Sequence, residues 1–320
     1  MVPEQALVDR FAFELDSLIA PGPPIGIAVS GGPDSLALLL LAAAARPGAV
    51  EAATIDHALR AGARDEAEMV EYRCRELGVP HSILTARWDD TPETAIQERA
   101  RNERYRLLGY WAEERALAGI ATAHHAEDQA ETILMRLSRG SGVRGLAGMR
   151  PKSVAPGAHV RVVRPLLGWR RSELEAICIA AGVAPARDPS NEDERFERVR
   201  VRRALAGAGW LDPSAIARSA ANLADADEAL KWACDNEWRR AVDERRERIA
   251  YRPNDAPREI VRRIVGRALR ELATEGEAEL RGGELDRMLA TLAKGGTGTL
   301  RGVQCSGGAV WHFERAAPRR

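Results

Sequence analysis

The chain has 320 residues, a length that suits two domains, and its 47 basic residues balance 47 acidic ones. This balance gives no overall sign of nucleic-acid binding, so any basic surface must be local. The four cysteines form no CxxC pair, which leaves zinc, iron–sulfur and thioredoxin-like sites without support. The N-terminus lacks a signal-peptide pattern and no apolar run approaches about 18 residues, so we expect a cytoplasmic protein with no membrane partner.

In chain order, the first 203 residues alternate apolar, strand-like runs with longer amphipathic runs. The runs that read as strands are Ile25–Val29, Val50–Ile55, His81–Trp88 and Gly119–His124. The runs that read as helices are Leu36–Ala45, Arg64–Leu77, Pro92–Leu117 and Ala126–Ser138. This alternation predicts an α/β fold with a doubly wound parallel sheet, covered by helices on both faces.

The later part of the chain has a different character. Residues 139–203 are rich in Gly, Pro and Arg and hold 14 basic against 7 acidic residues. They read either as a solvated, loop-rich extension or as a positive surface for phosphates. Beyond them the pattern predicts helices over 212–248, 256–273 and 278–292 and a strand pair over 297–315. We expect a first domain over 1–207 and a smaller, mostly helical second domain over 208–320.

The stretch SGGPDS, residues 30–35, separates the first predicted strand from the first helix of the sheet. Gly31 and Gly32 leave the main chain open to a ligand, and Pro33 suits the first turn of a helix. Backbone N–H groups at a helix start, together with the two flanking serine hydroxyls, form a site for an anion such as phosphate. Ligands of parallel sheets bind at the carboxyl ends of the strands, where this turn lies.

The chemistry of this turn differs from that of common nucleotide motifs. It has no lysine, so it is not a GxxxxGK[ST] P-loop, and GxGxxG is also absent. SGGPDS resembles the SGGxDS motif of the PP-loop ATP pyrophosphatases, which cleave ATP between the α and β phosphates. Asp34 then fits a magnesium ligand, because this hard cation favours carboxylate oxygens beside phosphates. The expected ATP-binding residues are Ser30, Gly31, Gly32, Pro33, Asp34, Ser35 and, after the second strand, Asp56 and His57. A helix N-cap is the alternative role for Asp56.

Five further stretches follow in order: IDHALR (55–60), ARNERY (100–105), TAHHAEDQAETILMRLSRGSGVRGLAGM (122–149), RPLL (164–167) and DPSNEDERFERVRVR (188–202). Together they closely resemble the tRNA(Ile)-lysidine synthetase family over about residues 22–203. The resemblance implies a ligase that uses ATP and Mg²⁺ to adenylate the C2 carbonyl of the wobble cytidine in the CAU-anticodon tRNA(Ile). The amine of free L-lysine then attacks C2 and expels AMP. The resemblance suggests a homodimer as often as not.

Three residues of HHAEDQAET are spaced by three, so a helix places His125, Asp128 and Glu131 on one face. The two carboxylates suit either a second magnesium or the ammonium of lysine. Histidine suits either a base for the lysine amine or a group that polarises a phosphate. The sequence leaves open whether His124 or His125 has this role, since a buried structural histidine is the alternative for each. The expected catalytic residues are Asp34, His125, Asp128, Glu131 and Arg200, and the expected metal ligands are Asp34, Asp128 and Glu131.

Arginines supply the remaining candidates. Arg101 and Arg104 share a helix face and read either as salt-bridged surface residues or as substrate contacts. Arg198, Arg200 and Arg202 alternate, which suits a strand with one charged face, and a guanidinium binds phosphate through two donors. We expect Arg200 to contact ATP or the adenylate and the other four arginines to bind substrate. Val199 stands where the family pattern has asparagine, which puts a side-chain role at this position in doubt.

Two other functions remain open at this stage. One is a tRNA thiolase of the same superfamily, which needs a thiol or an iron–sulfur cluster, and no paired cysteines lie near the predicted site. The other is a non-catalytic ATP sensor, against which the retained acids Asp34, Asp128 and Glu131 argue. Residues 208–320 contain no acid–histidine cluster, so we expect the second domain to position the tRNA rather than to carry chemistry.

Overall fold

The computed structural model describes residues 3–56, 63–86, 96–157, 159–184, 195–245, 247–273 and 282–316. The chain forms two compact units, Met1–Ala224 and Asp225–Arg320. The division falls within α9 (Pro213–Ala241), beyond the boundary that we expected after residue 207, because the first turns of α9 belong to the first unit. The expected ATP-binding residue His57 lies outside the described residues.

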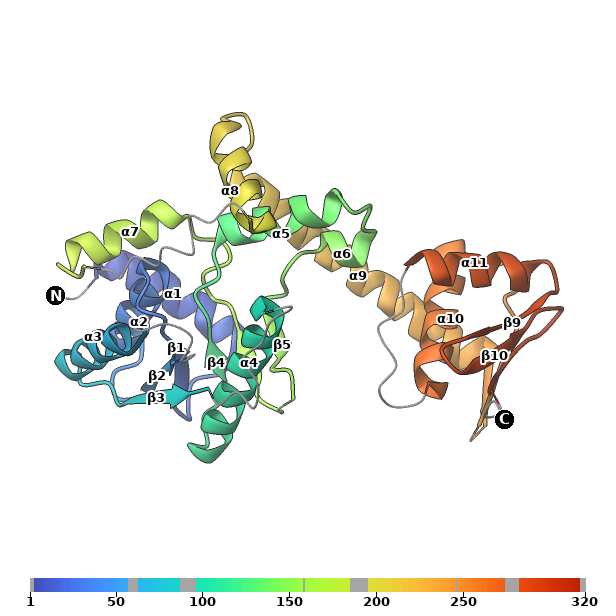
Figure 1. Cartoon of the computed structure of the whole chain (residues 1–320), viewed down its shortest axis with the longest axis horizontal. Coiled ribbons are helices and arrows are strands. Elements are labelled where there is room, and N and C mark those ends of the chain that lie inside the picture. Colours follow the sequence, from blue (N-terminus) through green and yellow to red (C-terminus); the bar gives the residue numbers. More distant parts are fainter. Residues whose placement is uncertain are drawn as a thin grey trace. The chain divides into compact units, whose positions relative to one another are not determined.

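The first unit is built on a six-stranded sheet with the order β3-β2-β1-β4-β6-β5 (Figure 1). Its strands in chain order are β1 (Ile25–Ala28), β2 (Val50–Asp56), β3 (His81–Thr85), β4 (Ile120–Ala121), β5 (Lys152–Val154) and β6 (Arg161–Val163). All neighbouring pairs are parallel except β5 and β6, which are antiparallel. The mainly parallel, doubly wound α/β fold predicted from the sequence is confirmed.

Helices connect these strands. They are α1 (Gln5–Leu18), α2 (Pro33–Ala45), α3 (Ala63–Glu76), α4 (Ile96–Glu114), α5 (Ala126–Leu137), α6 (Val143–Leu146), α7 (Arg171–Ala180) and α8 (Glu197–Gly207). The four helices expected before residue 139 correspond to α2, α3, α4 and α5, with ends that differ by a few residues. Residues 92–95 of the third one lie outside the described part of the chain.

Alternation along β1 explains how two helical layers cover the sheet. Ile25 and Ile27 are fully buried in the cluster that contains residues of α1, α2 and α7. The opposite side of β1 faces α4, and a Cβ placed on Gly26 would lie 2.6 Å from the Trp111 ring. Helix α2 is buried along Ser35–Ala42, as its continuous apolar sequence requires. Packing on both sides therefore fixes the end of β1, from which the glycine-rich turn starts.

The strand order also locates the binding edge. From β1 the chain moves outward to β2 and β3, then returns to β4 on the other side of β1. In such sheets ligands bind at this switch point, outside the carboxyl ends of the strands. SGGPDS follows β1, and His124 and His125 follow β4. The topology thus brings the two motifs to the same edge of the sheet.

Two sequence-based expectations for the first unit need correction. The described part of residues 139–203 forms α6, β5, β6, α7 and the start of α8, so the loop-rich alternative does not hold there. The stretch ERVRVRR forms the first two turns of helix α8 and not a strand. Val199 and Leu205 are buried on this helix, and Arg198 and Arg202, four residues apart, share a face. The burial of Val199 and Leu205 on a helix thus overrode the alternating pattern that had suggested a strand.

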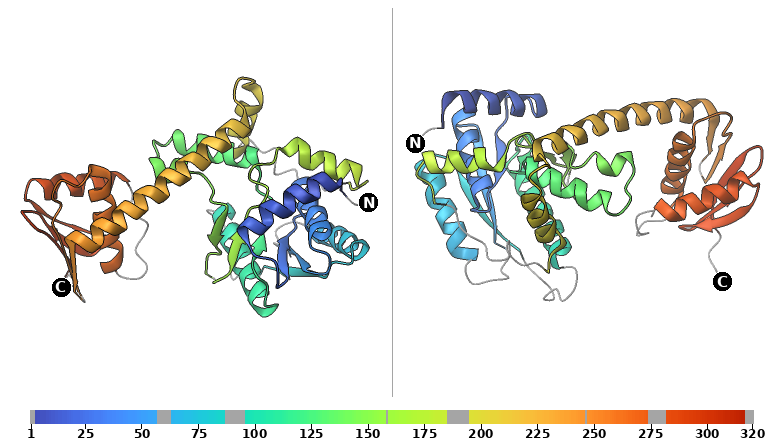
Figure 2. Two further views of the ribbon diagram at one scale, coloured as in Figure 1. Left: turned by 180° about the vertical axis from the view of Figure 1, so that it is seen from behind. Right: turned by 90° about the horizontal axis from the view of Figure 1, so that it is seen from above.

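The second unit contains the end of α9, two further helices and an antiparallel sheet with the order β7-β8-β11-β10-β9 (Figure 2). The helix expected over 212–248 ends at Ala241, and β7 (Val242–Arg245) and β8 (Arg248–Tyr251) follow as a hairpin. The other elements are α10 (Arg258–Leu272), α11 (Gly282–Ala293), β9 (Thr297–Leu300), β10 (Val303–Ser306) and β11 (Trp311–Arg315). The pair of strands expected over 297–315 is therefore three strands. Among the described helices, none is long and apolar enough to span a bilayer.

Candidate active site at the carboxyl edge of the first sheet

The glycine-rich turn has the geometry of an anion site. Gly31 adopts a φ of +80°, which favours glycine, and α2 begins at Pro33 with no side chain capping its N-terminus. The hydroxyl of Ser35 accepts a hydrogen bond from the N–H of Ser30 at 3.1 Å and donates one to the carbonyl of Gly32 at 2.9 Å. The turn is thus braced from within, and the N–H groups of Asp34 and Ser35, which have no partner among the described residues, remain for a ligand.

Asp34 lies in the first turn of α2, directly after this loop. Its Oδ1 is buried and has no hydrogen-bond partner among the described residues, and its Oδ2 lies 3.5 Å from His125 Nε2. A buried carboxylate oxygen without a partner calls for a ligand. The residue therefore fits a magnesium ion whose other ligands are substrate phosphates and water.

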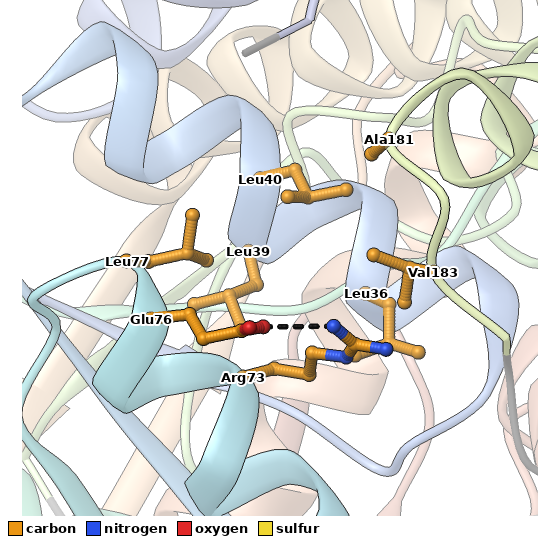
Figure 3. Close-up of a pocket in the computed structure, with 8 residues that line it drawn as sticks. All are labelled: Leu36, Leu39, Leu40, Arg73, Glu76, Leu77, Ala181 and Val183. Carbon is orange, nitrogen blue, oxygen red and sulfur yellow. Dashed lines mark hydrogen bonds and ion pairs between the residues drawn. The ribbon is translucent and has the colours of Figure 1, made fainter. Parts of the chain in front are cut away.

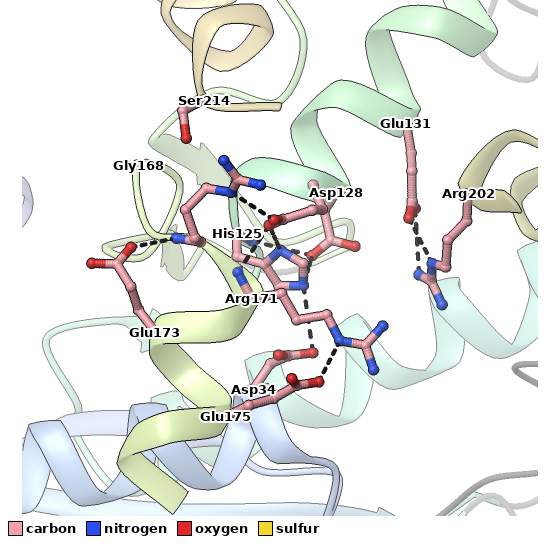
Figure 4. A network of polar contacts seen from close by, with 12 residues as sticks. Asp34, His125, Asp128, Glu131, Gly168, Arg171, Glu173, Glu175, Arg202 and Ser214 are labelled. Carbon is pink, nitrogen blue, oxygen red and sulfur yellow. Dashed lines mark hydrogen bonds and ion pairs between the residues drawn. The ribbon is translucent and has the colours of Figure 1, made fainter. Parts of the chain in front are cut away.

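His125 is the N-cap of α5 and is 4% exposed. The ring lies beside Asp34 and Asp128 (Figure 4). The backbone N–H of His125 donates to Asp128 Oδ2 at 3.1 Å, and its Nδ1–H donates to Glu127 Oε2 at 2.9 Å. Burial opposes protonation, but the contacts with Asp34 and Glu127 and the charge of Asp128 outweigh it and raise the pKa of His125 to about 10. The ring is therefore a cation at neutral pH, which suits the polarising role and not that of a base.

His124 has the opposite character. Burial, together with the positive charges of four nearby arginines, lowers its pKa well below the usual 6.5. These arginines are Arg164, Arg198, Arg101 and Arg104. Its Nδ1 lies 2.9 Å from Thr122 Oγ1. His124 is therefore a neutral imidazole, and of the two histidines it is the one with the protonation state of a base.

Two arginines of α8 hold the acids of α5. Arg198 donates its Nε to Glu131 Oε2 at 2.6 Å and its Nη2 to Asp128 Oδ1 at 2.7 Å. Arg202 donates its Nε to Glu131 Oε1 at 2.6 Å. Glu131 is 1% exposed, so its two oxygens are fully used by guanidinium groups. Arg200 lies on a different side of α8 and donates to the carbonyl of Arg195.

This pairing limits the metal assignment. Within the described ranges, no group of three or more His, Cys, Asp or Glu side chains is arranged to hold a metal ion. Asp34 fits a magnesium ligand, whereas Glu131 does not, because binding a cation there would require both arginines to leave. Asp128 is less enclosed than Glu131 but more so than Asp34. One of its oxygens accepts a hydrogen bond from Arg198, and the other lies 3.5 Å from His125 Nε2.

Arg101 and Arg104 both lie over the ring of Tyr105 on α4. Neither has an ion-pair partner among the described residues, so the salt-bridged surface that we considered for them is not seen. Burial and the charges of Arg101 and Arg198 lower the pKa of Arg104. The structure thus gathers positive charge near His124, and it adds Arg164, 7% exposed at the end of β6, to the arginines predicted from the sequence.

Other parts of the structure complete the description of the predicted residues. Asp56 ends β2, the neighbour of β1, and is half-buried. Glu127 and Arg170, which the sequence did not indicate, are bonded to each other at the edge of the site.

A pocket of about 410 Å³ lies elsewhere, between α2, α3 and the chain after α7 (Figure 3). It is lined mainly by leucines and by the Arg73–Glu76 ion pair and contains none of the predicted residues, so it is not the candidate active site.

A phosphate-binding turn after β1, with an acid in the next helical turn and a polar cluster after β4, defines a protein of the PP-loop class. A family model for the PP-loop domain matches residues 8–208. The tRNA(Ile)-lysidine synthase of Novosphingobium aromaticivorans is 46% identical over 302 residues, which cover 94% of this chain and 91% of the relative. The tRNA(Ile)-lysidine synthase of Zymomonas mobilis is 42% identical, and the match covers 92% of this chain and 89% of the relative. The chain belongs to the tRNA(Ile)-lysidine synthase family.

A solved structure of the U34-tRNA thiolase of Methanococcus maripaludis with its [4Fe-4S] cluster is also similar. It is 15% identical, the match covers 68% of this chain and 78% of the thiolase, and the TM-score is 0.56. At this identity the likeness shows the shared fold alone.

Proposed function

We propose that this protein is a ligase that joins free L-lysine to the wobble cytidine of the CAU-anticodon tRNA(Ile), with ATP as the activating substrate. The C2 carbonyl oxygen of cytidine attacks the α-phosphate of ATP, and pyrophosphate leaves. The lysine amine then adds to C2, the bond from C2 to the AMP oxygen breaks, and the amine gives up a proton. The observation that carries this proposal is the 46% identity to a named lysidine synthase along nearly the whole chain.

The phosphate-binding turn supports the first step. The N–H groups at the start of α2, with Ser30 and Ser35, are placed to bind ATP phosphates, and Asp56 at the end of β2 is expected nearer the adenosine. Mg²⁺ held by Asp34 would neutralise charge on the phosphates. The cationic ring of His125, beside Asp34, adds a fixed positive charge at the same place.

The second step needs a site for lysine. Of the two acids on α5, Asp128 suits the lysine ammonium better, because its side chain is 15% exposed and it holds only one guanidinium. Glu131 is enclosed by Arg198 and Arg202, so we assign it to placing these arginines. Burial and the nearby arginines lower the pKa of His124, so its ring is neutral and, of the two histidines, it is the one that can accept a proton from the attacking amine, as a weak base. Arg101, Arg104 and Arg164 would then face the anionic groups of the substrates.

The tRNA requires more surface than this edge provides. We assign the second unit to binding and positioning the tRNA, since such enzymes take the target base out of its stack while phosphate contacts set the register. We further propose that the protein acts in the cytoplasm and forms a homodimer. Arg200 stays a candidate for contact with ATP or the adenylate, although in this structure it does not face the acids of α5.

The thiolase alternative has less support. The four cysteines of the chain are all unpaired and buried. Cys178 lies against the turn, but its thiol donates to the carbonyl of Pro33 at 3.3 Å, and burial raises its pKa to about 11. A thiol in this state is a poor nucleophile.

Product analysis tests the proposal. The protein is incubated with ATP, L-lysine and a tRNA(Ile) transcript with the anticodon CAU, and the nucleotide products are separated. We expect AMP and pyrophosphate in equal amounts, and neither with a control transcript in which the wobble cytidine is replaced by uridine. ADP as the main product would contradict the PP-loop chemistry, and AMP formation with the control transcript would contradict the assigned target base.

A further inference from the structure

Glu127, in the first turn of α5, binds the ring of His125. Its Oε2 accepts hydrogen bonds from His125 Nδ1 at 2.9 Å and from the backbone N–H of Arg171 at 3.0 Å. Its Oε1 accepts a third from Arg170 Nε at 2.9 Å. The carboxylate thus joins the histidine after β4 to the first residues of α7.

These contacts fix the direction in which the other ring nitrogen points. With Nδ1 bound to Glu127, Nε2 lies 3.5 Å from both Asp34 Oδ2 and Asp128 Oδ2. The backbone of His125 is held separately, by Asp128. Since the His125 side chain is 5% exposed and that of Glu127 19%, water has little access to replace the carboxylate. Glu127 therefore sets the ring, while Asp128 sets the main chain.

Glu127 is itself held in place by Arg170. The guanidinium of Arg170 also donates to Asp212 Oδ1 at 2.9 Å, and Asp212 accepts from the N–H groups of Ser214 and Ala215 at the start of α9. The backbone N–H of Arg170 is bound by Glu173 Oε2 at 2.7 Å. Arg170 thereby ties together the N-terminal ends of α5, α7 and α9, all within the first unit.

We propose that Glu127, held by Arg170, is a positioning residue that orients His125 towards Asp34 and the phosphate-binding turn. The inference rests on the proposed function for its catalytic consequence, since the oriented ring would act on the ATP phosphates. Carboxylates that hold the far nitrogen of metal-ligating histidines account for a roughly 10- to 100-fold effect on affinity or activity, and we take the same range for Glu127. Because the N–H groups of the turn would supply most of the contacts to ATP, we expect replacement of Glu127 to change ATP binding little.

The test compares Glu127→Gln with a matched control, Glu175→Gln. Glu175 is an acid of the same region that pairs with Arg171 on the exposed side of α7 and does not contact His125. We expect Glu127→Gln to lower kcat for AMP formation about 10- to 100-fold and to leave the KM for ATP within about threefold. Glu175→Gln should match the wild type. A kcat for Glu127→Gln within about twofold of the wild type overturns the proposal, as does a loss confined to KM.

A double variant separates positioning from a structural role. If Glu127 acts through His125, the variant His125→Asn with Glu127→Gln should be no slower than His125→Asn alone, whereas independent losses would multiply. Glu127→Asp, which keeps the charge, should recover part of the lost kcat. Multiplied losses, or no recovery with aspartate, contradict the proposal.

A spectroscopic readout keeps the test independent of the reaction. The chain has six histidines, so ¹⁵N-labelled imidazoles give few signals, and His125→Asn assigns the relevant ring. We expect a Nδ1-bound proton in the wild-type ring that exchanges slowly, and fast exchange in Glu127→Gln. If the wild type forms no AMP, the proposed function fails, while this signal still reports on the orientation. An unchanged signal in Glu127→Gln refutes the inference whatever the activity.

Discussion

The pairing of α5 with α8 makes a quantitative prediction for three arginines of one helix. Arg198 makes two charged hydrogen bonds, to Glu131 at 2.6 Å and to Asp128 at 2.7 Å. Each such bond contributes about 1.5–3 kcal/mol, and because the side chain is 37% exposed we use the lower figure. Arg198→Ala is therefore expected to destabilise the contact between α5 and α8 by about 3 kcal/mol.

The neighbouring arginines supply graded controls. Arg202 makes one short bond to Glu131, so Arg202→Ala should cost about 1.5 kcal/mol. Arg200 donates to the backbone carbonyl of Arg195, which precedes α8, so Arg200→Ala should cost less than about 1 kcal/mol. The double variant of Arg198 and Arg202 leaves the buried Glu131 without either cation, and its cost should exceed the sum of the single costs by at least about 0.5 kcal/mol.

Hydrogen exchange is the suitable assay, because the two units need not unfold in one transition. The opening free energy of amides in α5 is measured by mass spectrometry for the four variants and the wild type. Equal costs for Arg198→Ala and Arg200→Ala would refute the placement of these side chains on α8. If the free-energy cost of the double variant equals the sum of the costs of Arg198→Ala and Arg202→Ala, the loss of both cations adds no extra penalty at Glu131, which contradicts this account.

Three further predictions concern the site and the second unit. Asp34→Ala and Asp128→Ala should each abolish AMP formation while circular dichroism stays as in the wild type, and near-normal turnover at saturating magnesium would contradict the role of the acid concerned. A chain cut after residue 224 should bind ATP, measured by calorimetry, with an affinity within a few-fold of that of the full chain, but its KM for tRNA should be much higher. The affinity of the full chain for tRNA should fall as the salt concentration rises. An unchanged KM for tRNA would assign tRNA recognition to the first unit. The acidic neighbours of His125 raise its pKa from 6.5 to about 10, so the stability that its protonated form adds is complete below about pH 6.5 and is lost as the pH rises towards 10. His125→Gln should therefore flatten this part of the plot of unfolding free energy, measured with urea, against pH. A plot identical to that of the wild type would contradict the ion pairs at the ring.

Much of the first unit was predictable because its signals are local. Apolar runs that end in a glycine-rich or polar cluster located β1, β2 and β4, and the motif SGGPDS located the phosphate turn. The alternation of strand and helix then predicted the parallel arrangement of β1, β2, β3 and β4. Each of these inferences needs only residues that are adjacent in the sequence, so tertiary packing did not overturn them.

The parts that the sequence did not predict depend on distant partners. The alternation of Arg198, Arg200 and Arg202 suggested a strand, whereas the helix is held by the buried Val199 and Leu205 and by the bond from Arg198 to Glu131, 67 residues away. The role of Glu127 could not be predicted for the same reason, because its partner Arg170 lies 43 residues further along the chain. The hairpin after Ala241 was obscured by its many charged residues, although the buried Ile249 and Tyr251 alternate as a strand requires.

The most direct measurement is the mass of the modified nucleoside. The protein is incubated with ATP, L-lysine and the CAU-anticodon tRNA(Ile), the tRNA is digested to nucleosides, and these are analysed by mass spectrometry. We expect one new nucleoside at the wobble position, equal in mass to cytidine joined to lysine with loss of water, that requires both ATP and lysine. A thiolated nucleoside, or ATP consumption with no new nucleoside, would contradict the proposed function.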